Sequence, residues 1–177
     1  VIETLPQIAP KHVKRICELV KSGFYDGLKF HRVIDDFMAQ TGCPNGDGTG
    51  RTGVSIPAEF SKENFVRGAV GMARTHEPDS ADSQFFICLA DCEFLNGKYT
   101  LWGRVISGME YVDKIKKGDE QNNGHVKNPD EIIFENEIKK SERSIKKHYK
   151  LNKLELLYFS YLVCLTSIRH ELEHVIQ

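Results

Sequence analysis

Apolar residues near the start of the chain recur every three or four positions, which is the spacing of one face of an α-helix. They are Val13, Ile16, Cys17 and Val20. Pro10 precedes this stripe and Gly23 follows it, the order in which helices commonly begin and end. The pattern therefore predicts a helix over residues 10–22, preceded by the end of a strand at residues 1–5.

From residue 28 to residue 106, short runs rich in β-branched and aromatic residues alternate with turn residues. The runs read LKFHRVI, FMAQTG, VSIPAEF, RGAVGMA, SQFFICLA and YTLWGRVI. Several short strands at such spacing are typical of an all-β barrel or sandwich. Beyond them, Met109, Val112 and Ile115 predict a second helix over 109–118, and the run PDEIIFENEI predicts a last strand over 131–138.

Residues 139–177 differ in composition from the rest of the chain. The segment 139–153 carries seven Lys and Arg residues against one Glu, and residues 154–168 are mostly apolar. The longest uncharged run, Leu156 to Ile168, has 13 residues, whereas a membrane-spanning helix needs roughly 20. We expect a docked amphipathic helix here, with an interfacial contact to anionic lipid as the alternative.

The bulk composition, 28% charged and 40% hydrophobic among 177 residues, describes a soluble globular protein of one sizeable domain. A formal net charge of −1 argues against a nucleic-acid-binding protein, whose footprint is basic. Five cysteines without a paired framework indicate free thiols and a reducing compartment, and their spacing does not fit a zinc site. We expect a cytoplasmic protein, with the periplasm as the alternative. The chain begins at Val1, as a processed form or a fragment would, so the absence of a visible signal peptide carries little weight.

Two segments invite a ligand-binding or catalytic interpretation that their residues do not support. The stretch NGDGTGRTG (45–53) has Arg51 where a phosphate-binding P-loop needs lysine, and Val54 where a calcium loop needs glutamate. The stretch THEPDSADSQ (75–84) contains Ser, His and Asp but no nucleophile elbow. We interpret the first as a flexible glycine-rich loop, the second as turn residues, and His31 as a packed structural histidine.

The stretch FHRVIDDFMAQTG (30–42) places Arg32 and Gln40 among large apolar residues. Residues 35–36, both Asp, would form a turn between two strands, so that Met38 and Gln40 point to one face. Later segments add Ala73 and Arg74, then Gln84 and Phe86, then Phe94, Leu95 and Tyr99. Each segment alone is typical of a strand core. Together they make core packing a weaker explanation, because a cation and amides recur beside apolar residues and no nucleophile accompanies them.

In their order and spacing, FHRVIDDFMAQTG, GTG, AEF, GMA, DSQFFI and FLNGKYTLWGRVISGMEYVDKI resemble the cyclophilins, a family of peptidyl-prolyl cis–trans isomerases. GFYDG, YTLWG and NPDEI are most similar to bacterial members, particularly alphaproteobacterial ones. The resemblance implies an all-β, closed, antiparallel eight-stranded barrel capped by two helices, in one isomerase domain over 1–138 that the extension 139–177 follows. The family usually has another strand before the segment matching residues 1–5. This sequence does not include it, so we expect exposed backbone groups there.

The resemblance also implies the site. By motif, the catalytic residues are Arg32, Phe37 and Gln40, and the substrate-binding residues are Met38, Ala73, Arg74, Gln84, Phe86, Phe94, Leu95 and Tyr99. Many relatives carry tryptophan at position 94 and histidine at position 99. Phenylalanine cannot donate an indole N–H hydrogen bond, so we expect weakened cyclosporin binding with isomerisation retained.

The activity that the resemblance implies is rotation about X-Pro bonds in proline-containing peptides and unfolded proteins, by a monomer that needs no metal or cofactor. Two alternatives remain open at this point. The missing strand and the unusual extension favour a binding module of cyclophilin shape without useful turnover. The basic and apolar segments of the extension would suit a membrane-associated form.

Overall fold

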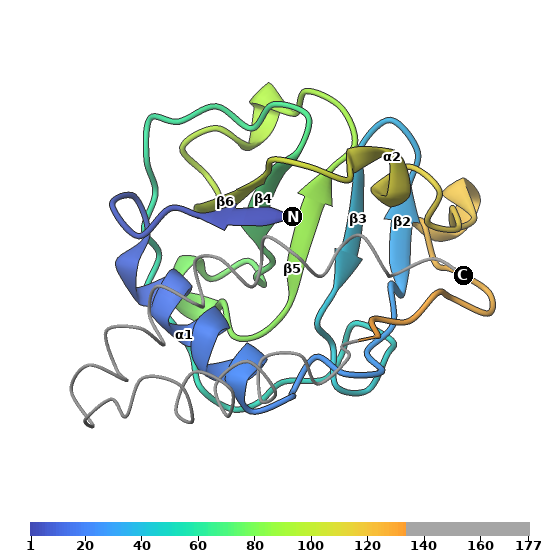
Figure 1. Ribbon diagram of the computed structural model, residues 1–177, viewed down its shortest axis with the longest axis horizontal. Coiled ribbons are helices and arrows are strands. Elements are labelled where there is room, and N and C mark those ends of the chain that lie inside the picture. Colours follow the sequence, from blue (N-terminus) through green and yellow to red (C-terminus); the bar gives the residue numbers. More distant parts are fainter. Residues whose placement is uncertain (134–177) are drawn as a thin grey trace, which may run out of the picture.

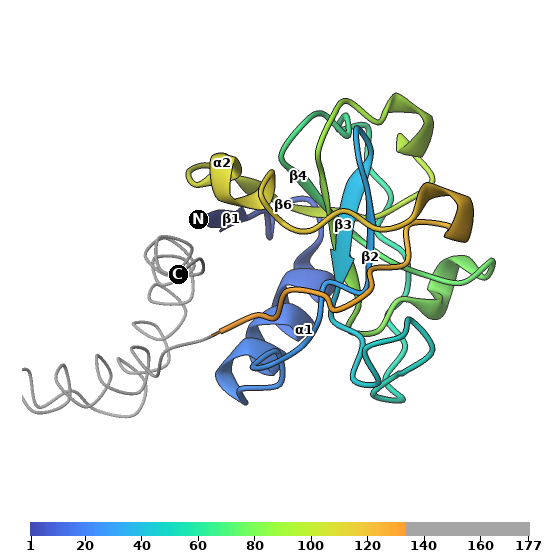
Figure 2. The ribbon, with the colours of Figure 1, turned by 90° about the vertical axis from the view of Figure 1, so that its right-hand side faces the viewer.

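The computed structural model describes residues 1–133, in which six strands form one antiparallel sheet of order β1-β6-β4-β5-β3-β2. The strands are β1 Ile2–Thr4, β2 Arg32–Ile34, β3 Met38–Thr41, β4 Ala69–Met72, β5 Phe85–Cys88 and β6 Leu101–Val105. The helix α1 (Pro10–Lys21) lies below the strands and α2 (Met109–Val112) above them (Figures 1 and 2). Three short 3-10 helices, η1 Pro78–Ser80, η2 Glu93–Leu95 and η3 Glu120–Asn122, lie in the connections.

The first predicted helix is confirmed, and a distant carboxylate caps it. Pro10 stands in its first turn, and Gly23, at φ 73°, follows its last. The backbone N–H groups of Lys11 and His12 donate to the carboxylate of Glu59 at 3.1 and 3.0 Å. Amides at a helix start have no partner within the helix, so an acidic side chain placed there stabilises it.

The closed eight-stranded barrel expected from the resemblance is not confirmed. The edge strands β1 and β2 do not pair with each other among residues 1–133, so the sheet stays open. The run VSIPAEF adds only an isolated bridge between Ile56 and Ala81, because Pro57 has no N–H to give to a ladder. The strand predicted over 131–138 has one bridge, from Lys29 to Glu131. Its residues from 134 on, and the whole extension 139–177 with its predicted helix, lie outside the described residues.

The second predicted helix is present but shorter than its sequence pattern. After Val112 the hydrogen bonds tighten, since the N–H of Ile115 donates to the carbonyl of Val112 three residues back. The next amides then take tertiary partners: Lys116 donates to Asp130 Oδ2, and Gly118 to the carbonyl of Val33. Within residues 1–133, no helix is long and apolar enough to span a bilayer.

The sheet separates two apolar clusters because side chains alternate between the faces of a strand. The larger cluster packs the sheet against α1 and includes Val33, Ala39, Val70 and Ile87. Strand residues next to these in sequence point to the other face, among them Met38, Ala69, Phe86 and Cys88. With Leu95 and Leu101 they form a second cluster. Most of the residues expected to form the groove lie on this second face.

Candidate active site

Residues from four strands form a row across the second face of the sheet. In the strand register, Arg32 on β2 is opposite Gln40 on β3, Gln40 is opposite Phe86 on β5, and Phe86 is opposite Gly71 on β4. Directly opposite side chains on one face lie close enough to interact. The register therefore places the cation of Arg32, the amide of Gln40 and the ring of Phe86 side by side along the row.

Gly71 is the last residue of this row, and its lack of a side chain leaves room for two aromatic rings. A Cβ atom at this position would lie 2.5 Å from Cζ of Phe86 and 2.6 Å from Cε1 of Phe65. The two rings instead stack over the glycine with centroids 5.9 Å apart, and Tyr99 meets Phe86 edge to face at 5.8 Å. The absence of a side chain at Gly71 thus sets the position of the Phe86 ring.

Nine of the eleven residues predicted for the site line one pocket of about 100 Å³, here called the aromatic pocket: Arg32, Phe37, Met38, Gln40, Ala73, Arg74, Phe86, Leu95 and Tyr99. Phe94 stands at its rim, 59% exposed, with its ring centroid 5.2 Å from that of Phe37. Gln84 does not line this pocket, but its side chain contacts that of Gln40, which does. The structure therefore brings the predicted residues together, while their individual roles stay predictions.

The guanidinium of Arg32 is fixed by three groups. Its Nε donates to the carbonyl oxygen of Asn123 at 3.0 Å, its Nη2 to Oδ1 of Asn123 at 2.9 Å, and its Nη1 to Oε1 of Gln40 at 3.2 Å. Nη1 also lies 4.0 Å from the sulfur of Met38. Burial lowers the pKa of Arg32 from its ordinary value, and Tyr99 acts against this shift. An arginine stays protonated under such a shift, so the pocket holds a fixed, partly desolvated cation.

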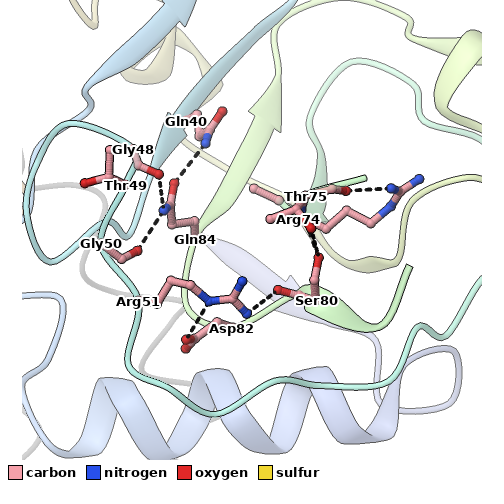
Figure 3. A pocket seen from close by; sticks show the side chains of 11 residues that line it. Gln40, Gly48, Thr49, Gly50, Arg51, Arg74, Thr75, Ser80, Asp82 and Gln84 are labelled. Atoms are coloured by element: carbon pink, nitrogen blue, oxygen red, sulfur yellow. Dashed lines mark hydrogen bonds and ion pairs between the residues drawn. The ribbon is translucent and has the colours of Figure 1, made fainter. Parts of the chain in front are cut away.

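A chain of amides leads from Arg32 to a second pocket. Nε2 of Gln40 donates to Oε1 of Gln84 at 3.0 Å, and Nε2 of Gln84 donates to the carbonyls of Gly48 and Gly50 at 2.9 and 3.0 Å. Figure 3 shows this chain at one side of a pocket of about 280 Å³, here called the polar pocket. Its lining residues are Gln40, Gly48, Thr49, Gly50, Arg51, Ala73, Arg74, Thr75, Ser80, Asp82 and Gln84.

Two parts of this arrangement escaped the sequence analysis. Asn123 lies in the stretch QNNGH, which reads as turn residues, and nothing in the sequence relates it to an arginine 91 positions earlier. The sequence of the glycine-rich loop 45–53 predicts only a flexible connection, yet the loop lines the polar pocket. The one available signal was its glycine content, because glycines allow a backbone to approach a ligand closely.

The segments rejected as catalytic motifs have structural roles in the described residues. The hydroxyl of Ser80 donates to the carbonyl of Glu77 and accepts from the backbone N–H of Thr75, so it holds a turn. His31 is buried, with 3% of its surface exposed. Across residues 1–133, no three His, Cys, Asp or Glu side chains are grouped to hold a metal ion. Four of the five cysteines fall in this part of the chain, and Cys43, Cys88 and Cys92 among them are free thiols, as expected.

Comparison with known proteins identifies the family. A family model described as "Cyclophilin type peptidyl-prolyl cis-trans isomerase/CLD" matches residues 1–136. A probable peptidyl-prolyl cis-trans isomerase of Brucella abortus is 56% identical over 144 residues, covering 75% of this chain and 74% of that protein. A cyclophilin structure from Hirschia baltica gives a TM-score of 0.64 at 27% identity, covering 72% of this chain and 65% of that one. A cyclophilin-type isomerase structure from Cryptosporidium parvum, determined in the presence of the dipeptide Ala-Pro, gives 0.66 at 28% identity, covering 76% of this chain and 92% of that one. The chain is therefore an isomerase that belongs to the cyclophilin-type peptidyl-prolyl cis–trans isomerase family.

Proposed function

We propose that this chain speeds the cis–trans interconversion of X-Pro bonds in proline-containing peptides and unfolded proteins, with Arg32 favouring the twisted amide. The observation that carries the proposal is the guanidinium of Arg32, which Asn123 and Gln40 hold in place beside an apolar pocket. The Cryptosporidium relative was crystallised with a dipeptide that ends in proline, which supports the same substrate class here.

The reaction itself explains why a cation is useful where no nucleophile stands. Rotation about a peptide bond meets a barrier of about 18–20 kcal/mol, which comes from partial double-bond character. For X-Pro bonds the two isomers differ by only about 0.5–1 kcal/mol, yet they exchange over tens to hundreds of seconds. No covalent bond is made or broken, so catalysis needs only a preference for the twisted geometry over the planar one.

Arg32 would supply that preference. When the amide twists, resonance is lost and the prolyl nitrogen becomes a better hydrogen-bond acceptor. A guanidinium N–H directed at this nitrogen, or at the neighbouring carbonyl, then binds the transition state more tightly than the ground state. The contacts with Asn123 and Gln40 orient the group before substrate arrives, which avoids reorganisation during the reaction. Partial exclusion of water strengthens the interaction.

The remaining lining residues would divide between the ring and the backbone of the substrate. Phe37, Met38, Phe86 and Leu95 offer an apolar wall for a proline ring. The amide of Gln40 would hold a substrate carbonyl, with Ala73, Arg74 and Gln84 along the peptide backbone. One side of the X-Pro bond would then be pinned while the other rotates.

The test is exchange of a short X-Pro peptide measured by NMR, with the wild-type chain beside Arg32→Ala and Arg32→Lys. We expect the alanine variant to lose about 100-fold in catalysed exchange, as when a preorganised donor is removed from other enzymes. We expect lysine to restore little, because it lacks the fork that donates to two partners. Circular dichroism of the same samples reports whether each variant is folded.

Two outcomes would overturn the proposal. Wild-type turnover by a folded Arg32→Ala variant would remove Arg32 from its role. A folded wild-type chain that binds the peptide without speeding exchange would identify a binding module in place of a folding catalyst.

A further inference from the structure

The polar pocket and the aromatic pocket are neighbours. Gln40, Ala73 and Arg74 line both of them. These three residues form the ridge between the pockets. A backbone hydrogen bond holds the ridge in position, since the N–H of Ala73 donates to the carbonyl of Gln84 at 2.9 Å. If the aromatic pocket takes the proline, as proposed above, the shared residues would bring a flanking side chain of the peptide to the polar pocket.

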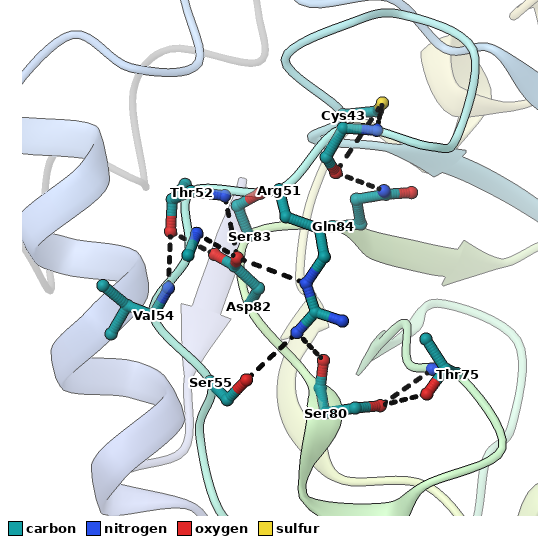
Figure 4. A network of polar contacts seen from close by, with 12 residues as sticks. Cys43, Arg51, Thr52, Val54, Ser55, Thr75, Ser80, Asp82, Ser83 and Gln84 are labelled. Carbon is teal, nitrogen blue, oxygen red and sulfur yellow. Dashed lines mark hydrogen bonds and ion pairs between the residues drawn. The ribbon is translucent and has the colours of Figure 1, made fainter.

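The charges that line the polar pocket do not cancel. Two arginines, Arg51 and Arg74, face one aspartate, Asp82, which leaves a formal charge of +1. The carboxylate of Asp82 already accepts hydrogen bonds from the backbone N–H groups of Thr52 and Gly53 and from the hydroxyl of Thr52 (Figure 4). These three donors, all from the loop, hold Asp82 in its place.

The two arginines differ in what they leave free. The guanidinium of Arg74 donates to the carbonyls of Lys98, Thr75 and His76, and it lies 4.5 Å from the centroid of the Tyr99 ring. All three of its nitrogens are engaged by the protein. Arg74 therefore shapes the ridge and offers few donors to a ligand.

Arg51 keeps one nitrogen free. Its Nη2 donates to Oγ of Ser55 at 3.0 Å and to the carbonyl of Ser80 at 2.9 Å, and its Nε lies 3.8 Å from Oδ2 of Asp82. Among the described residues, Nη1 of Arg51 has no hydrogen-bond partner. Figure 3 shows the guanidinium between Asp82 and Ser80. The contacts hold the cation in position while the N–H groups of Nη1 stay available to a ligand.

We propose that Arg51 makes the polar pocket select an acidic side chain of the substrate, so that the protein favours X-Pro sequences with Glu or Asp near the proline. This inference rests on the proposed function. A carboxylate matches the charge of the pocket and can accept a charge-assisted hydrogen bond from Nη1 of Arg51. A lysine side chain in the same pocket would meet a fixed positive charge.

The size of the preference follows from the exposure of Arg51, whose side chain is 40% exposed. Ion pairs at such half-open positions are weak, so we expect a twofold to fivefold preference rather than an absolute one. The same exposure makes the preference sensitive to salt. It should largely disappear at about 1 M salt, where charges are screened over about 3 Å.

The experiment uses the full chain and a set of X-Pro peptides that carry Glu, Gln or Lys at one of the three positions before or after the proline. NMR exchange gives kcat/KM for each peptide. We expect one position at which the order is Glu, Gln, Lys with a total span of about twofold to fivefold. In Arg51→Gln the Glu-to-Lys ratio should fall to about one, and in Arg51→Glu it should invert.

A matched control comes from Arg104, whose side chain is also 40% exposed and which pairs with Glu63 away from both pockets. Arg104→Gln changes the net charge equally and should keep the wild-type ratio. The proposal is overturned if no position separates Glu from Lys, or if Arg51→Gln keeps the preference. If instead no peptide of any sequence exchanges faster with the wild-type chain, it is the proposed function that fails.

Discussion

Asn123 holds Arg32 although the two residues are 91 positions apart in the sequence. The backbone carbonyl oxygen and the side-chain oxygen of Asn123 accept hydrogen bonds from two different nitrogens of the guanidinium. The loop that carries Asn123 is tied to β2, since the N–H of Val33 donates to the carbonyl of Gly124 at 2.8 Å. Asn123 itself has a φ of 52°, a left-handed conformation that asparagine tolerates better than most residues. The backbone of the loop and the orientation of the arginine are therefore set together.

Removing the side-chain oxygen of Asn123 should loosen Arg32 without removing its charge. We expect Asn123→Ala to lower kcat by about tenfold with a smaller change in KM, because a hydrogen bond to a charged group contributes about 1.5 kcal/mol or more. The measurement is peptide exchange at several substrate concentrations.

Asn123→Gly separates this effect from backbone strain. A left-handed alanine costs roughly 1–2 kcal/mol, whereas glycine adopts the same conformation freely. Both variants should lose activity alike, while only the alanine variant loses stability. An active glycine variant would show that the side-chain oxygen does not position Arg32.

A methyl group at Gly71 should disturb the pocket from beneath. Because a Cβ there overlaps the rings of Phe86 and Phe65, we expect Gly71→Ala to lower the free energy of unfolding by about 1–3 kcal/mol. Urea unfolding followed by the fluorescence of Trp102, the single tryptophan of the sequence, measures this change. The second substitution Phe86→Leu should restore part of the loss, since it removes one of the two overlapping rings. An unfolding midpoint equal to that of wild type would show that the rings shift at no cost.

Local patterns were enough to predict much of this molecule. The stripe from Val13 to Val20 predicts α1, and the turn of two aspartates between β2 and β3 appears where expected, with Asp36 at φ 52°. The residues of the aromatic pocket were found because they belong to contiguous motifs. The contact between Asn123 and Arg32 has no such motif, since it depends on how a distant loop folds back. The closed barrel was expected from likeness alone, and the described residues form an open sheet.

Phe94 provides a test at the rim of the aromatic pocket. Its exposed ring lies beside Phe37 but has no hydrogen-bond donor. We expect Phe94→Trp to bind cyclosporin about twofold to tenfold more tightly, because an indole N–H adds one hydrogen bond of about 0.5–1.5 kcal/mol. Calorimetric titration of both proteins gives the comparison, and peptide exchange should change little. Equal affinities would refute a role for the indole donor.

Acid should destabilise the protein through His12 and Glu59, whose side chains meet at 2.7 Å. Burial lowers the pKa of His12 below 6.5 and outweighs the opposing effect of Glu59. Burial acts to raise the pKa of Glu59, but hydrogen bonds from His12 and the backbone N–H groups of His12 and Lys11 lower it overall from 4.5. In both cases the unfolded state binds protons more readily, so stability falls as the pH falls.

The loss should begin as the pH drops below about 6.5, where the unfolded histidine becomes charged, and continue below about 4.5 as the unfolded glutamate takes up protons. Urea unfolding at a series of pH values measures it. His12→Gln should flatten the slope in the upper part of this range. His31, whose pKa burial also lowers, accounts for a residual slope there. An unchanged slope in the His12→Gln variant would contradict the assignment.

The row from Arg32 through Gln40 and Phe86 to Gly71 forms only when the strands fold in the correct register. A shift of one residue in any of these pairings would turn the side chains of that strand to the opposite face. Only a sheet that pairs β2, β3, β5 and β4 in this order contains the row, and a misaligned sheet does not reproduce it. Recovery of turnover after dilution from denaturant is therefore a stringent reporter of native strand alignment, one that compact but misregistered chains would fail even when their secondary-structure content looks complete.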